Sequence, residues 1–156
     1  MRFARRQYRA VSASHNGNVE PTDFEEVLCS WDWWDCPRSG IALVHGKPHR
    51  FLCEFSHELD DYPAEFMVWP IGDDQLEAEL AAWERWVDWR SRFDRGEAVD
   101  PFEHEPGFEE LRQYLQTTVE APAEALSAIP EWRLDPNRSF AGRVPQHRVR
   151  WTYAPS

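Results

Sequence analysis

The densest group of side chains able to recognise a ligand lies between Trp31 and Gly40, where the sequence reads WDWWDCPRSG. Indole rings can stack on planar or sugar-like molecules, and a guanidinium can fork onto a carboxylate or phosphate. The candidate ligand-binding residues combine these groups with a carboxylate and a hydroxyl, and are Trp33, Trp34, Asp35, Arg38 and Ser39. The competing interpretation is structural: the indoles cover one end of the core, and an ion pair between Asp35 and Arg38 fixes the loop.

Some of these residues could also support catalysis. Asp35 could accept a proton, Arg38 could hold an anionic substrate, and His57, which precedes three carboxylates within residues 58–61, could act as a general acid or base. A solvated acidic turn between two strands explains the 57–62 segment equally well. The sequence has no Gly-rich phosphate loop and no nucleophile-elbow serine, so it leaves open whether the protein is an enzyme.

A histidine and cysteine series resembles a metal site in its spacing. His45, His49, Cys53 and His57 recur every four residues, which on a helix would align them on one face. This segment predicts strands instead, and four residues of a strand span roughly 13 Å, too far for one zinc ion. We therefore expect no metal and no cofactor. A metal-assisted hydrolase that uses these histidines is the last of the functional alternatives.

The three cysteines are Cys29, Cys36 and Cys53. The odd count and the absence of an apolar leader or membrane-length apolar run favour the reducing cytoplasm. Cys53 is expected to be a small buried apolar side chain. Cys36 could be a nucleophile only if a histidine lies beside it.

The charge distribution bears on the choice of partner. Twenty-eight acidic residues against seventeen basic ones leave a net charge of −11, and Lys47 is the only lysine, a bias typical of a GC-rich bacterial genome. Residues 54–110 hold eighteen acids and four arginines, whereas residues 1–10 and 133–156 are rich in arginine. Such a balance argues against a nucleic-acid partner. It suits either solubility alone or a basic protein partner.

The elements that would position these residues form one domain over residues 1–156. Residues 1–22 are expected to be a basic arm and loop, and residues 24–71 to hold antiparallel strands at 24–31, 40–45, 49–55 and 65–71. Residues 74–128 are expected to be helical: a long helix at 75–95 capped by Asp74, a second after Phe108, and a short third from Pro122 to Ala128. Alternation over residues 146–153 predicts a final strand.

These elements predict an α+β fold, with an antiparallel sheet of four to five strands packed against one long Trp-rich helix and shorter helices. The first functional hypothesis is a cytoplasmic binding or regulatory protein, of the inhibitor or toxin-neutralising type, that uses its acidic, Trp-rich surface. The second is a small-molecule binder or modest hydrolase with its site at residues 31–40. We expect no membrane association, and a homo-oligomer is compatible with the sequence.

Overall fold

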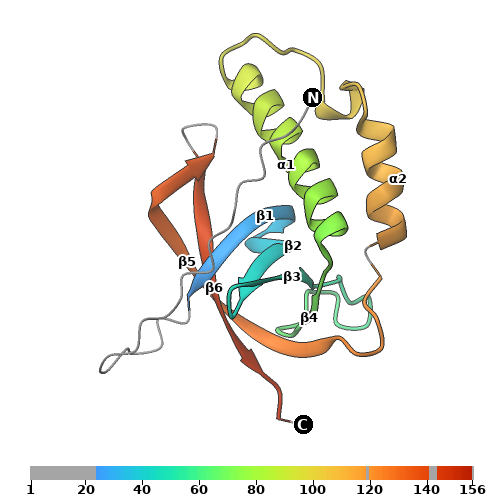
Figure 1. Ribbon diagram of the computed structural model, residues 1–156, viewed down its shortest axis with the longest axis vertical. Coiled ribbons are helices and arrows are strands. Elements are labelled where there is room, and N and C mark those ends of the chain that lie inside the picture. The colour runs from blue at the N-terminus through green and yellow to red at the C-terminus, as the bar shows by residue number, and fades with distance from the viewer. Residues whose placement is uncertain (1–23, 119, 141–143, 156) are drawn as a thin grey trace.

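The computed structural model describes residues 24–118, 120–140 and 144–155. Its described strands form a closed antiparallel barrel in which each strand pairs with the next and β6 returns to β1 (Figure 1). The strands are β1 (Glu25–Trp34), β2 (Cys36–Val44), β3 (Lys47–Leu52), β4 (Phe66–Pro70), β5 (Leu126–Phe140) and β6 (Val144–Tyr153). The predicted α+β class, an open sheet packed against one long helix, is therefore wrong. The sheet closes on itself and the helices cover only part of its outer face.

Five of the strands correspond to predicted ones, and β5 was not predicted. The expected short helix from Pro122 to Ala128 is wrong, because β5 begins at Leu126. β5 contains Pro130 and Pro136, residues that argue against a central strand because they lack an N–H. Beyond Ala128, however, β5 is paired with β6 alone, so a proline can face the unpaired side at no cost in ladder hydrogen bonds.

The barrel interior is filled by alternate residues of the strands. Phe51 is fully buried at its centre and contacts the rings of Phe66, Trp132 and Trp151 at centroid distances of 5.6–6.2 Å. Gly40 makes room for this ring: a Cβ there would lie 2.2 Å from the Cys29 carbonyl oxygen and 2.8 Å from the Phe51 ring. The interior is therefore a packed core.

A second apolar layer lies between the outer face of the barrel and helix α1 (Asp73–Asp94). The predicted helix at 75–95 is confirmed, and Trp83, at 8% exposure, packs against Leu28, Cys29 and Ile41. The predicted Asp74 cap is wrong, because Gly72 is the N-cap and no side chain caps the helix.

One charged pair lies inside this layer. Arg50 of β3 and Glu79 of α1 form an ion pair at 1% and 0% side-chain exposure. Burial lowers the pKa of the Arg50 guanidinium from its ordinary value. The pair therefore joins the helix to the barrel at a point that excludes water.

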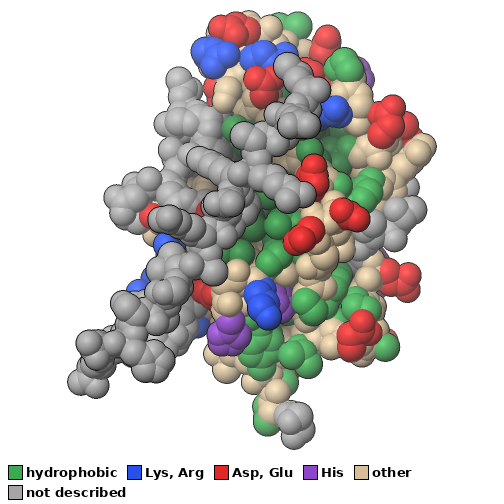
Figure 2. Space-filling model, viewed as in Figure 1, with side chains coloured by type: hydrophobic (Ala, Val, Ile, Leu, Met, Phe, Trp, Pro, Cys, Tyr) green, Lys and Arg blue, Asp and Glu red, His purple; other side chains and the backbone are tan. Residues whose placement is uncertain are grey.

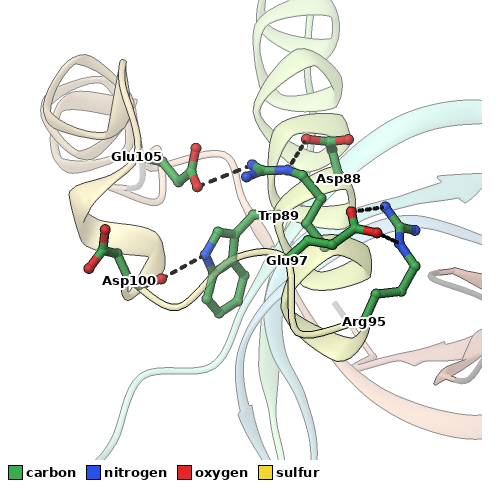
Figure 3. A network of polar contacts seen from close by, with 7 residues as sticks. Asp88, Trp89, Arg95, Glu97, Asp100 and Glu105 are labelled. Carbon is green, nitrogen blue, oxygen red and sulfur yellow. Dashed lines mark hydrogen bonds and ion pairs between the residues drawn. The ribbon is translucent and has the colours of Figure 1, made fainter.

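The C-terminal end of α1 is fixed to the loop that follows it (Figure 3). The Trp89 indole N–H donates to the Asp100 carbonyl oxygen at 3.0 Å, and Arg92 contacts both Asp88 and Glu105. This loop leads through a short 3₁₀ turn (Phe102–His104) to α2 (Phe108–Thr118). The helices thus form a buttressed pair beside the barrel (Figure 1).

The seam between β1 and β6 is short. The two strands pair only at Glu25 with Val149 and at Glu26 with Arg148. Arg148 strengthens the start of the seam by donating from Nε and Nη2 to the Phe24 carbonyl oxygen at 3.2 and 2.9 Å, and Arg133 and Arg150 lie over the Phe24 ring. The C-terminal arginines thus help to close the barrel. The predicted basic arm at 1–22 lies outside the described residues.

Candidate functional site

The residues of the predicted 31–40 loop form the β1–β2 hairpin. Trp34 pairs with Cys36 across Asp35, which joins the two strands with φ at 60°. Asp32, within β1, also has a positive φ of 53°, a conformation that aspartate tolerates better than most residues. The pairing register of β1 with β2 is nonetheless continuous from Cys29 to Trp34, so strand alternation places Trp31 and Trp33 on one face of the hairpin and Trp34 on the other.

A groove opens beside this hairpin, where β1 and β6 separate beyond their short seam. It encloses about 320 Å³ and lies between β1, β6 and α1. We call it the aromatic groove. Its aromatic and charged lining residues are Trp31, Asp32, Trp33, Trp83, Trp86, Arg90 and His147. Ligand pockets are commonly this size, mostly apolar, and supplied with a few polar groups.

The indole rings meet at defined angles. The Trp31 and Trp83 rings are nearly perpendicular, at 88° with centroids 5.4 Å apart, whereas Trp83 and Trp86 stack at 17° and 5.1 Å. Trp33 is 57% exposed and leans on the His147 ring at 5.0 Å. The groove thus has two aromatic walls and an exposed indole at its edge.

The charged groups of the groove are few. Asp32 lies in its lining and accepts a long hydrogen bond from Ser39 Oγ at 3.4 Å. Arg90 also lies there, and its Nε is 3.2 Å from the Asp94 carboxylate, which offsets its charge. Burial lowers the pKa of His147, so its imidazole is neutral at pH 7. The lining residues Asp32 and Arg90 carry opposite charges, and Asp94, which lies outside the lining, brings the three groups to a net charge of −1.

Arg38 points away from the groove. Its guanidinium lies over the Tyr62 ring, 4.3 Å from the centroid, and Nε donates to the Trp34 carbonyl oxygen at 2.9 Å. None of its contacts in the described part of the chain is with a carboxylate, so the expected ion pair with Asp35 is not formed there. Arg38 instead ties the hairpin to the 54–62 segment.

That segment and the hairpin make an acidic end of the barrel. Phe55 contacts Tyr62 and His57, and both Phe55 (41%) and Leu59 (64%) are exposed, as is Trp34 (61%). Exposed carboxylates surround them, namely Asp35, Glu54, Glu58, Asp60 and Asp61. None of the five takes part in an ion pair with another described residue.

A shallow hollow continues this surface along β3 and β4. It encloses about 700 Å³, and three carboxylates, Glu54, Glu65 and Glu120, alternate there with apolar side chains that include Leu52 and Met67. We call it the acidic hollow. The face drawn in Figure 2 has the same character, with acidic and apolar side chains interspersed over the helical side of the molecule.

The thiols and imidazoles do not assemble a reactive centre among the described residues. Burial raises the pKa of Cys29 to about 12 and also raises the pKa of Cys36 and Cys53, which opposes thiolate formation. Within the same part of the chain, no three His, Cys, Asp or Glu side chains converge as metal ligands would. His45 and His57 are exposed, and among the described aromatic rings His57 contacts that of Phe55.

The structure separates the five predicted ligand-binding residues. Trp33 lines the aromatic groove, Ser39 is buried beside Asp32, Trp34 and Asp35 are exposed at the hairpin tip, and Arg38 lies over Tyr62. Of the predicted catalytic candidates, Asp35 lies at the hairpin tip, Arg38 lies over Tyr62 and His57 contacts Phe55, and no hydrogen bond or ion pair between described residues joins the three.

Sequence analysis did not identify the groove residues contributed by other elements, namely Trp83, Trp86, Arg90 and His147. For Trp83 and Trp86, the width of the apolar arc on the 75–95 helix was an available signal, because it exceeded what a single sheet face needs; Arg90 and His147 carried no such signal.

Comparison of the chain with protein-family models, with curated proteins and with solved structures gave no match. Functional inference therefore depends on the surfaces described above. Neither helix, within the residues that the structure describes, carries an apolar stretch long enough to span a lipid bilayer.

Proposed function

We propose that this protein is a binding protein that recognises a basic segment of another protein at the acidic end of its barrel and along the acidic hollow. The observation that carries the proposal is a set of exposed carboxylates without ion-pair partners beside exposed aromatic side chains. Elsewhere on the described surface some carboxylates, such as Asp88, Asp94 and Glu109, are paired with arginines, and unpaired ones, such as Glu77 and Glu84, lie on helix α1.

Electrostatics and packing both support this function. Unpaired charges of one sign accelerate the encounter with an oppositely charged partner. Tryptophan is among the residues that most often supply binding energy at interfaces, and Trp34 is largely exposed. The distribution of carboxylates along the hollow suits the spaced charges of an extended segment better than a single ion. A role as an inhibitor or toxin-neutralising protein is one form that such recognition can take.

A small basic peptide tests the surface directly. We would titrate a fluorescein-labelled peptide of nine arginines with the full chain and follow fluorescence anisotropy at several salt concentrations. The triple variant Glu54→Gln/Glu65→Gln/Glu120→Gln should bind about tenfold more weakly than the wild type, because three favourable charge contacts are lost. Trp34→Ala should also weaken binding.

The control has the same change in net charge at another place. Glu77, Glu84 and Glu110 are exposed on the helices and pair with no described arginine. Their replacement by glutamine should reduce affinity much less. Equal losses in the two triple variants would mean that the peptide responds only to the overall charge of the protein, and the proposed binding surface would be wrong.

A further inference from the structure

The aromatic groove has a shape and charge that the recognition of a basic segment at the acidic end does not use. We propose that it is a cage for an organic cation that carries a substituted ammonium group. The site is separate from the acidic hollow: the two share no lining residue, and the groove lies between β1, β6 and α1.

The arrangement of the aromatic rings in the groove suits a cation. A cation is attracted to the electron-rich face of an aromatic ring, most strongly to that of tryptophan. Trp31 and Trp83 are perpendicular, and Trp86 stacks on Trp83 at 17°, so Trp86 covers part of the buried Trp83 ring and its own ring plane is also nearly perpendicular to that of Trp31. Trp33, at the rim, is sufficiently exposed to move onto a ligand. Aromatic walls at right angles offer a rounded ammonium group contact on more than one side.

The charges of the side chains in and around the groove also favour a cation. Asp32 supplies a carboxylate in the lining, while Asp94 offsets the guanidinium of Arg90. His147 is neutral at pH 7, since burial lowers its pKa, so it does not repel a cation. An anion would meet Asp32 in the groove and a protein whose net charge is −11. The balance of charge therefore favours a positively charged ligand over a carboxylate or phosphate.

The volume of the groove and the weak hydration of the ligand class are also compatible with binding. A volume of about 320 Å³ can take a trimethylammonium head and part of the molecule attached to it. Substituted ammonium groups are weakly hydrated compared with a primary ammonium, so an apolar groove selects them. Two sources share this chemistry: a free quaternary amine, and a methylated lysine side chain of a protein.

The test compares a cation with its neutral isostere on the full chain. We would titrate choline and 3,3-dimethylbutan-1-ol, which have nearly the same shape, and follow intrinsic tryptophan fluorescence and isothermal calorimetry. Choline should bind at least about tenfold more tightly, because only the cation is attracted to the ring faces. A histone-like peptide with trimethyl-lysine, compared with the same peptide carrying unmodified lysine, distinguishes a protein-borne ligand from a free amine.

Variants at the hairpin provide matched controls. Trp33→Ala removes a groove indole and Asp32→Asn removes the carboxylate, and each should weaken binding of the preferred cation about fivefold or more. Trp34→Ala removes the neighbouring exposed indole outside the groove and should leave choline affinity unchanged; because Trp34 belongs to the acidic end, this control is made with choline and not with the peptides. Circular dichroism and thermal melts of each variant report whether the fold is retained, and Asp32→Asn retains nearly the same side-chain volume.

Each outcome of these titrations either supports or overturns the proposed cation site. Tight binding of choline or of the trimethyl-lysine peptide, with loss in the Trp33 and Asp32 variants, supports the cage and identifies its source. Equal affinity for choline and its neutral isostere overturns the proposal, because the groove would then be only apolar. Absence of saturable binding by both cations, or equal losses in the Trp33 and Trp34 variants, also overturns it. The Trp33 and Asp32 variants change no residue of the acidic end or of the acidic hollow, so failure here leaves the proposed function standing.

Discussion

Removal of one member of the buried Arg50–Glu79 pair is the perturbation whose effect can be worked out most fully. Both side chains are almost completely excluded from water, at 1% and 0% exposure. At about 4 Å and an effective dielectric constant of about 20, two unit charges attract each other by about 4 kcal/mol. Glu79→Leu leaves a buried guanidinium without its partner, and Arg50→Met leaves a buried carboxylate. We expect each single variant to lose about 3–5 kcal/mol of unfolding free energy.

The double variant Arg50→Met/Glu79→Leu should behave differently. It removes both charges and fills the space with apolar groups of similar volume. The ion pair joins Arg50 Nη1 to Glu79 Oε1, and the remaining atoms Arg50 Nε and Glu79 Oε2 are buried without a hydrogen-bond partner among the described residues. The desolvation of the pair is therefore incompletely compensated. We therefore expect the double variant to be as stable as the wild type, or more stable by about 1–2 kcal/mol.

Urea denaturation at pH 7, followed by tryptophan fluorescence and far-ultraviolet circular dichroism, measures these differences. For a chain of this length, a loss of 3–5 kcal/mol corresponds to a fall in Tm of roughly 6–20 °C. The reasoning would be refuted if the single variants cost less than about 1 kcal/mol, or if the cost of the double variant equalled the sum of the two single costs.

Three further predictions concern other parts of the molecule. Gly40→Ala should lower the unfolding free energy by about 2–3 kcal/mol or more, because its Cβ would collide with the Cys29 carbonyl. Gly46 has a φ of 74° and open space around it, so Gly46→Ala should cost only about 1 kcal/mol in the same urea titration. His147 has a lowered pKa in the folded protein, so as the pH falls the unfolded chain takes up a proton before the folded one. Thermal melts from pH 7.5 to pH 5 should therefore show the wild type losing stability relative to His147→Gln below about pH 6.5. A stability difference that stays constant with pH would contradict this. Arg38→Ala should cost about 1–2 kcal/mol through loss of the Tyr62 contact, and a double-mutant cycle with Asp35→Ala should show a coupling energy near zero, because no ion pair joins them.

The local elements could be predicted because their signals are local. The strands β2 and β3 follow from apolar runs on either side of the sequence Gly46-Lys47-Pro48, and α1 follows from its helical apolar period. The expected three-residue turn at 46–48 is wrong, because Val44 pairs with Lys47 and the turn is formed by His45 and Gly46. Closure of the barrel could not be predicted in the same way. It depends on two residue pairs between β1 and β6, separated by more than a hundred residues, and on β5, whose prolines mask its strand character.

The residues of the candidate site likewise differ in whether a local sequence pattern marks them. Trp33 could be identified because the cluster around it is dense in the sequence. Trp83 and Trp86 of α1 and His147 of β6, which complete the groove, lie far from Trp33 in the sequence. Glu79 carried a signal that was not used: it lies four residues before Trp83 on the apolar face of the helix, and a carboxylate there requires a buried partner.

The buried ion pair also bears on the groove, because Glu79 and Trp83 are one turn apart on α1. Arg50 is paired with Ile41 in the sheet, and Ile41 packs against Trp83. Apolar contacts are non-directional and tolerate a helix that slides or rotates slightly, whereas an ion pair specifies one position. We therefore expect the Arg50→Met/Glu79→Leu variant to retain its thermal stability but to hold the Trp83–Trp86 stack less uniquely against Trp31. Near-ultraviolet circular dichroism, which reports fixed tryptophan environments, should lose intensity in this variant while the Tm is unchanged or raised. An unchanged near-ultraviolet spectrum would show that the apolar layer alone fixes the helix, and that the pair contributes nothing to the geometry of the groove.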